Sequence, residues 1–257
     1  MELRKGLSLK VQGAESVELG DWDSVKDRIL FKLVNTDINR KALEEEKIVH
    51  IDWYDMSIVF YIELYKNDDK LVSLQVTESL KDLWGVTAET IDEYAFDNTK
   101  IINPIVITTL YDKGVEAAEE LGVEVPELPE GTDKYGSYIL TNTDNYNGAV
   151  VMRYPAFLTA LSETMKSDLY IVPGAVHEAL AVRTSDYPED ADIAKLFVML
   201  MNNNMNINTK EDMLSNNIFR FSRETESLSV VERPGEIVFE EMLDSAFAEM
   251  LENVANQ

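Results

Sequence analysis

The feature that most constrains the fold of this chain is a strict alternation of side chains between Met56 and Leu64. Every second position holds a large apolar residue. The positions between them are occupied by Ser57, Val59, Tyr61 and Glu63. Successive side chains of a β-strand point to opposite faces, so this pattern predicts a strand with one fully apolar face. A polar Asn-Asp-Asp turn at 67–69 and a second alternating run at 72–76 follow. Segment 56–76 is therefore predicted to form a β-hairpin that contributes to a hydrophobic core.

Helical and extended patterns share the rest of the chain. Apolar spacings of three and four, with capping residues before them, predict helices at 21–33, 40–46, 77–84, 87 to the Asn-Pro break at 103–104, 111–121, 155–165, 191–201 and 236–254. Short extended runs predict strands at 7–11, 105–107, 138–140, 149–152, 169–172, 179–182, 218–221 and 228–231.

The order of these elements indicates the fold class. Strands come in adjacent pairs between helices, a pattern that fits antiparallel pairing better than serial βαβ crossovers. The sequence predicts an α+β fold with antiparallel hairpins flanked by helices. A length of 257 residues allows one large domain or two small ones. The best linker, 122–131, contains two prolines and divides the chain into predicted halves 1–122 and 132–257, which can pack as one domain.

The chain is strongly acidic, with 48 Asp and Glu against 23 Lys and Arg and a formal net charge of -25. Residues 112–133 hold eight acids against one lysine, a local net charge of -7, and residues 224–257 hold nine acids against one arginine, a net charge of -8. Such a field repels nucleic acid and anionic membranes and attracts basic protein surfaces. The candidate interaction surface comprises Asp112, Glu116, Glu119, Glu120, Glu124, Glu127, Glu130, Asp133, Glu236, Glu240 and Glu241.

Several chemistries are excluded or disfavoured by what the sequence lacks. The chain has no cysteine, so disulfides and thiolate metal sites are impossible. It has no phosphate-binding glycine motif and no nucleophile-elbow motif, and we expect no cofactor and no metal. The absence of basic patches argues against direct nucleic-acid binding. Without a leader-like segment or a long apolar run, we expect a cytoplasmic protein that does not contact a membrane.

Only two histidines are present, and His177 is followed by Glu178 as in a zinc-protease motif. That motif needs a second histidine four residues after the first, where this chain has Ala181. A hydrolase would instead need a pocket in which His177 meets a polar partner. The candidate pocket residues are His177, Glu178, Asn142, Asn147 and Asp168. The alternative interpretation is that the His-Glu pair is structural.

Several stretches of the chain resemble a known family. They begin at residues 22, 56, 84, 138, 167 and 202, and read WDSVKDRILFKLVN, MSIVFYI, WGVTAETIDEYAFDNT, YILTNTDNYNGAVVMRYPAFL, SDLYIVPGAVHEALAV and NNNMNINTKEDMLSNNIFRFSRE. In order and spacing, over about 21–228, they are similar to the uncharacterised bacterial domain-of-unknown-function family 5688, found in gut-type anaerobes and their mobile elements. The resemblance implies a fold type and a bacterial or phage context, but no activity. The family's usual Pro-Ser-Ser before the His-Glu pair is Pro173-Gly174-Ala175 here, so a role of those serines would be lost.

Three functions are compatible with these observations, and the sequence favours a non-enzymatic one. The first is an acidic binding or regulatory protein that contacts a basic protein surface, for instance an inhibitor that mimics a phosphate backbone and blocks a nucleic-acid-handling protein. The second is a structural or housekeeping protein whose acidity maintains solubility. The third is a hydrolase that uses His177 and Glu178.

Overall fold

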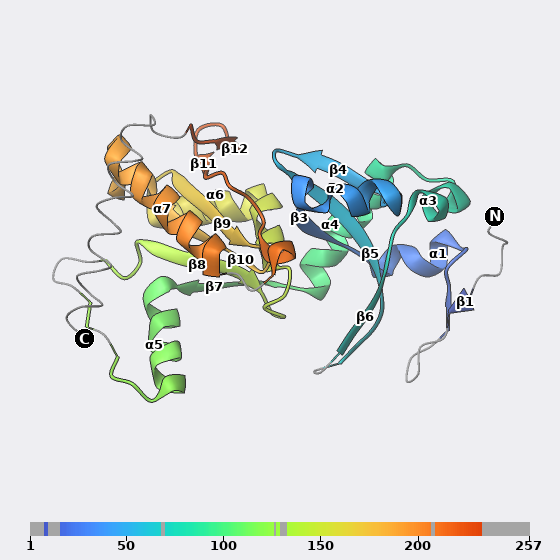
Figure 1. Cartoon of the computed structure of the whole chain (residues 1–257), viewed down its shortest axis with the longest axis horizontal. Helices are drawn as coiled ribbons and strands as arrows, with labels where there is room; N and C mark the ends of the chain where they lie inside the picture. The colour runs from blue at the N-terminus through green and yellow to red at the C-terminus, as the bar shows by residue number, and fades with distance from the viewer. Residues whose placement is uncertain are drawn as a thin grey trace.

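The computed structural model describes residues 8–9, 16–67, 70–125, 127–128, 133–206 and 209–232. The described chain forms two large antiparallel sheets with helices around them, which confirms the predicted α+β class (Figure 1). A short pair of strands, β1 (Ser8–Leu9) and β2 (Val17–Glu18), precedes them. The predicted C-terminal helix 236–254 lies outside the described residues.

The first sheet is built on the predicted hairpin. Strand β5 (Met56–Asn67) lies at its centre, and β3 (Ile29–Asn35) pairs along one edge of β5. Strands β4 (His50–Trp53) and β6 (Lys70–Gln75) share the other edge. The alternating apolar residues of β5 are all buried in the main core. The hairpin prediction is therefore confirmed.

Helices surround this sheet. They are α1 (Trp22–Val25), the 3-10 turn η1 (Lys26–Arg28), α2 (Thr36–Glu45), α3 (Glu78–Trp84) and α4 (Ala88–Ile102). Helix α4 lies along β3, and side chains of α4 form hydrogen bonds with backbone groups at the start of β3. The Asn98 amide donates to two carbonyl oxygens, one of them at Ile29, and the Thr99 hydroxyl accepts from the Phe31 N–H at 3.2 Å. Two groups at the outer edge of β3, the Ile29 carbonyl and the Phe31 N–H, are thereby hydrogen-bonded without another strand.

The predicted helix 21–33 is wrong beyond its first turns, because Ile29–Asn35 is strand β3. The apolar residues in this run fit a helical spacing at Ile29 and Leu33, but Ile29, Phe31 and Leu33 also alternate. Both faces of β3 are largely buried, so apolar residues occupy nearly every position. Periodicity alone does not separate helix from strand in such a run.

The second sheet has six strands in the order β12-β11-β9-β10-β8-β7, and every neighbouring pair is antiparallel. The strands are β7 (Ile105–Thr109), β8 (Ser137–Asn142), β9 (Leu169–Ala175), β10 (Glu178–Arg183), β11 (Phe219–Ser222) and β12 (Ser227–Val230). Helices α5 (Leu110–Leu121), α6 (Pro155–Met165) and α7 (Asp190–Asn206) and the turns η3 (Thr184–Asp186) and η4 (Lys210–Asp212) accompany them. Helix α7 packs on the face of β9.

Strand β9 continues through Pro173 and Gly174, where the sequence predicted its end. Strand β11 pairs with β9 only over residues 169–171, and the register between β9 and β10 shifts beside the proline. Proline is tolerated at such an irregularity because its missing N–H breaks no regular ladder bond. Tertiary pairing therefore extends the strand past a residue that would end it in a regular sheet.

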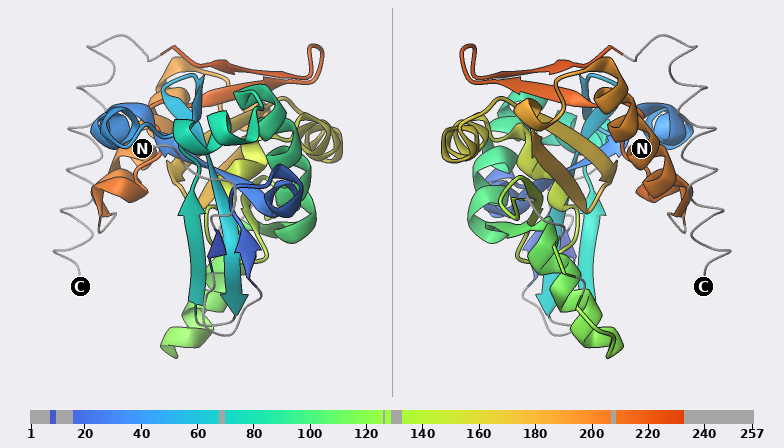
Figure 2. Two further views of the ribbon diagram at one scale, coloured as in Figure 1. Left: turned by 90° about the vertical axis from the view of Figure 1, so that its right-hand side faces the viewer. Right: turned by 90° about the vertical axis from the view of Figure 1, so that its left-hand side faces the viewer.

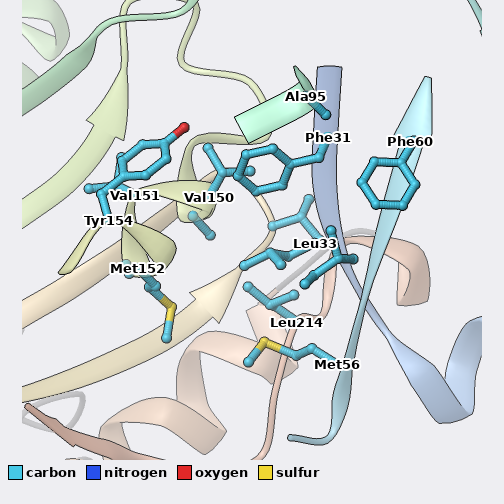
Figure 3. Close-up of a cluster of buried hydrophobic side chains, with 14 of the residues drawn as sticks. Phe31, Leu33, Met56, Phe60, Ala95, Val150, Val151, Met152, Tyr154 and Leu214 are labelled. Atoms are coloured by element: carbon cyan, nitrogen blue, oxygen red, sulfur yellow. The ribbon is translucent and has the colours of Figure 1, made fainter. Parts of the chain in front are cut away.

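A buried 3-10 segment, η2 (Gly148–Arg153), joins the two sheets. The predicted strand 149–152 is wrong here, since this segment pairs with no strand and lies between β3 and the second sheet. Figure 3 shows Val150 beside Phe31, which projects from the first sheet. Because these side chains are buried on all sides, their apolar run carried no periodic signal.

One hydrophobic cluster includes residues of both sheets, such as Phe60 of β5 and Ile171 of β9. The chain passes from the first sheet to the second at 103–104, where α4 ends and β7 begins. Strand β7 and helix α5, which precede the predicted linker 122–131, thus belong to the second sheet. The division into domains itself stays a prediction.

The tight turn between β4 and β5 forms another tie between the sheets. Tyr54 has a φ of 60°, an unusual backbone conformation for a bulky residue, and its hydroxyl donates to the carbonyl of Leu228 in β12 at 2.8 Å. Its ring packs against Phe219 of β11, with 5.0 Å between centroids. The next residue, Asp55, accepts hydrogen bonds from the buried Ser215 hydroxyl at 2.7 and 2.9 Å. These contacts account for a strained backbone at this position.

Candidate functional site

His177 lies in the turn between β9 and β10, and both ring nitrogens face a polar neighbour. Its Nδ1 atom accepts a hydrogen bond from the backbone N–H of Asn147 at 3.2 Å, and its Nε2 atom lies 3.6 Å from Oδ1 of Asp212. The ring packs against Tyr146, with 5.0 Å between centroids. A neutral imidazole that accepts at Nδ1 carries its proton on Nε2. His177 is therefore hydrogen-bonded to the turn after β8, and Asp212 of η4 lies near its Nε2 atom.

The turn after β8 brings Asn142 and Asn147 to this site. Asn142 stabilises the turn itself, because its Oδ1 accepts from the Asp144 N–H at 3.1 Å and its Nδ2 donates to the Tyr146 carbonyl at 2.9 Å. Asn147 has a φ of 54°, a conformation that asparagine adopts more readily than most residues. At the next residue, Gly148, a Cβ atom would overlap the hydroxyl of Thr141 in β8 and the carbonyl oxygen of His177. Only glycine fits there.

The other two predicted pocket residues lie elsewhere. Glu178 is exposed at the start of β10, where it lines a separate pocket with Leu110 and Ala179. Asp168 precedes the first residue of β9, at the opposite end of that strand. It forms an ion pair with Arg220 at 2.7 Å and accepts from the Arg223 N–H at 3.1 Å. The structure thus brings together His177 and the two asparagines, but places Glu178 and Asp168 apart from them.

A cleft of about 850 Å³ opens next to this site, between the β5–β6 hairpin and the turn after β8. Lys66 of the hairpin bridges the cleft by an ion pair with Asp144, and Tyr146 lines it on the opposite side. Burial raises the pKa of Glu63 on the cleft wall above its usual value. With Lys70 also present, the lining carries two acidic and two basic groups. Sequence reasoning missed these residues because the hairpin and the turn lie far apart in the chain and carry no shared motif.

Neither a metal site nor a membrane span is indicated by the described residues. Within them, no cluster of three or more His, Asp or Glu side chains is arranged to bind a metal ion. No helix in the described part of the chain has both the length and the apolar character to cross a membrane.

The candidate acidic surface centres on α5, which begins directly after β7 and extends beyond the rest of the sheet (Figures 1 and 2). Its carboxylates at 112, 116, 119 and 120 are all exposed, as is Glu124 just after the helix. Lys113 pairs with Glu116 at 2.7 Å, and Lys134 lies 3.9 Å from Asp112. No ion pair within the described residues reaches the carboxylates at 119, 120, 124 and 127. Apolar groups accompany these charges, because Leu121 is 77% exposed.

The remaining predicted acidic residues are distributed differently. Asp133 is engaged within the molecule, since it pairs with Arg183 at 2.9 Å and accepts from the Tyr135 N–H. Glu224 and Glu226 lie in the β11–β12 turn, at the opposite margin of the second sheet from β7 and α5. Four residues lie outside the described part of the chain: Glu130, Glu236, Glu240 and Glu241.

Comparison with known proteins gives one finding. A family model described as "Family of unknown function (DUF5688)" matches residues 7–223 of the chain, in agreement with the resemblance found in its motifs. No curated protein and no solved structure matches the chain.

Proposed function

Because the chain belongs to this family of unknown function, we propose a role from its geometry: it is a non-enzymatic protein that docks on a basic protein surface through α5. The observation that carries the proposal is the placement of exposed carboxylates on a projecting helix, with Glu119, Glu120 and Glu124 lacking ion-pair partners among the described residues. Carboxylates that are not neutralised within the molecule are available to a cationic partner.

The geometry of α5 suits an interface more than a purely solubilising surface. Glu116 and Glu120 are one helical turn apart, so their carboxylates lie on one face about 6 Å apart along the axis. Leu121 and Val123 add exposed apolar area, 77% and 58% exposed, next to that charge. Interfaces combine apolar contact with complementary charge, whereas charge alone suffices for solubility.

A partner with a basic face that normally contacts nucleic acid fits this chemistry. The protein would then act as an inhibitor by covering the phosphate-binding groups of its partner. The described residues of the second acidic segment, 224–232, add nothing to this finer proposal, because they lie at the other margin of the sheet. Helix α5 is thus the part of the surface that the described chain provides.

The hydrolase alternative draws less support from the site. A general base must have a free nitrogen directed at the substrate proton. Nδ1 of His177 accepts a backbone hydrogen bond and Nε2 faces Asp212, while Glu178 lines a separate pocket. The cleft beside it is polar, but its Lys66–Asp144 ion pair ties its two walls together.

The test compares two charge-reversal variants. One carries Glu119→Lys, Glu120→Lys and Glu124→Lys; the matched control carries Glu44→Lys, Glu45→Lys and Glu46→Lys at the exposed end of α2. Each variant changes the formal net charge from -25 to -19. Proteins retained by the wild type from host-cell lysate are identified by mass spectrometry, purified and used in surface-binding kinetics at two salt concentrations.

We expect the α5 variant to lower the association rate by about tenfold or more, and the α2 variant to leave it nearly unchanged. Association of the wild type should slow as salt rises, because exposed charges are screened over about 8 Å at physiological ionic strength. Equal loss in both variants, or an association rate indifferent to salt, would reject docking through α5 and leave solubility as the explanation of the charge.

A further inference from the structure

Among the described residues, strand β7 forms an open edge of the second sheet, and none of them protects it as the other sheet edges are protected. Side chains of Asn98 and Thr99 bond the edge of β3, and the Tyr54 hydroxyl bonds an edge carbonyl of β12. Strand β4 has four residues including Asp52, and β6 carries Lys70 and faces a register shift. Charges, short length and bulges are the usual devices against strand addition. Strand β7 is uncharged throughout, with the sequence Ile-Val-Ile-Thr-Thr.

The register shows which backbone groups of β7 are available. The Thr143 N–H donates to the Pro104 carbonyl at 2.9 Å, so this pair is a hydrogen-bonded pair of the β7–β8 ladder. Because such pairs alternate along an antiparallel ladder, Val106 also bonds to β8 and its neighbours Ile105 and Ile107 direct N–H and C=O away from it. In the described part of the chain, no backbone or side-chain group bonds to that outer edge at Ile105 or Ile107.

The side chains and surroundings of β7 also suit an added strand. β-Branched residues favour extended pairing, and Ile107 is 41% exposed where a neighbouring strand would cover it. Helix α5 starts immediately after β7 (Figure 1), so Asp112 in its first turn lies next to one end of the open edge, and the other carboxylates follow along the helix. A strand added to β7 would therefore meet a negative field at that end.

We propose that the outer edge of β7 accepts an extended basic segment of a partner protein by β-strand addition, with basic residues of that segment contacting α5. A second copy of this chain is the less suitable occupant, because both copies carry the same formal net charge of -25 and repel each other. This inference rests on the proposed docking through α5 and specifies its mode. Backbone hydrogen bonds of Ile105 and Ile107 supply the pairing, and α5 supplies the preference for positive charge.

The test uses a defined probe, a fluorescent peptide of alternating threonine and valine with three lysines at one end. Two versions carry the lysines at either terminus, and a third has an N-methylated central residue. Ile107→Pro removes an outward N–H without removing a ladder bond to β8, because proline is tolerated where an edge N–H faces solvent. Ile107→Val is the matched control, since it keeps the N–H and the β-branched shape. Full-length variants are compared by fluorescence anisotropy, with circular dichroism as the check on folding.

We expect the wild type and Ile107→Val to bind the same one of the two lysine-bearing peptides with equal affinity. Ile107→Pro in the protein, or N-methylation of the peptide, should each weaken this binding about tenfold. On binding, amide hydrogen exchange should slow at Ile105 and Ile107 but not at Val106 and Thr108, whose N–H groups already bond to β8. This alternation is a readout that purely ionic attraction would not produce.

The outcomes separate this inference from the proposed function. If reversing the α5 charges abolishes binding while Ile107→Pro and N-methylation have no effect, strand addition is overturned and docking through α5 stands. If the edge changes matter while the α5 charges do not, strand addition stands and the proposed function fails. If the wild type binds none of the peptides, strand addition is overturned. The lysate experiment then tests docking through α5 independently.

Discussion

Phe60→Ala should destabilise both sheets together. Phe60 lies on the apolar face of β5 and is fully buried in the cluster that both sheets share. A buried phenylalanine removes about 150 Å² or more from water, so at about 25 cal/mol per Å² the loss is about 4 kcal/mol. That value lies within the range of about 3–5 kcal/mol observed for this substitution in cores. We therefore expect the free energy of unfolding to fall by about 3–5 kcal/mol.

Two measurements check this expectation. Denaturant unfolding gives the change in free energy, and the melting temperature should fall by about 6–20 °C for a chain of this size. Hydrogen exchange then locates the effect, because peptides from β9 and β10 should lose protection along with those from β5. Leu71→Ala on β6 is the control. Leu71 is 36% exposed, and the change should cost less than about 1 kcal/mol.

An unchanged melting temperature in Phe60→Ala would refute the burial of Phe60 in the core. A normal loss of stability that leaves exchange in 169–183 unaltered would instead refute the shared core. The two sheets would then unfold independently.

Further substitutions test single contacts. Gly148→Ala should lower the free energy of unfolding by about 1–3 kcal/mol, because the added methyl group overlaps the adjacent turn. Gly114→Ala in α5, where no atom lies within 4 Å of the added methyl group, should raise it by up to about 1 kcal/mol. Tyr54→Phe should cost about 0.5–1.5 kcal/mol by removing its hydrogen bond to Leu228. Burial raises the pKa of Glu63 above its usual value of 4.5, so just above pH 4.5 the folded state binds more protons than the unfolded state. The free energy of unfolding should therefore fall as the pH rises from 4.5 through the raised pKa. Glu63→Gln should abolish this pH dependence. Zinc chelation should leave the melting temperature unchanged, since two histidines without cysteine rarely form a closed site.

Each of these expectations has a contradicting result. Equal stabilities of Gly148→Ala and the wild type would show that the turn can move aside. A Tyr54→Phe variant as stable as the wild type would mean that ring packing alone holds the β4–β5 turn. A Glu63→Gln variant with the wild-type pH dependence would place that carboxylate in water, and stoichiometric zinc in purified protein would overturn the metal prediction.

Local patterns in the sequence predicted the elements that have one buried face and a clear boundary. The β5–β6 hairpin follows from alternation, and α4 follows from Thr87, whose hydroxyl accepts the Thr90 N–H at 3.2 Å. Helix α3 ends at Gly85 with a φ of 69°, as its glycine predicts. The candidate site was predictable only in part. His177 and the two asparagines were named from scarcity and turn chemistry, but Asp212, which lies 35 residues further on, carries no local signal.

The sequence by itself determined the acidic character of the chain, the hairpin, most helices and the antiparallel α+β class, because these depend on composition and on short-range periodicity. Only the tertiary structure decided that Ile29–Asn35 is a strand, that residues 148–153 form a buried 3-10 segment, and that β7 lies at an open edge beside α5. The physical reason is that periodicity reports which face of an element is buried. A segment buried on all sides has no such contrast, and the position of a strand in its sheet is fixed by hydrogen bonds to distant residues.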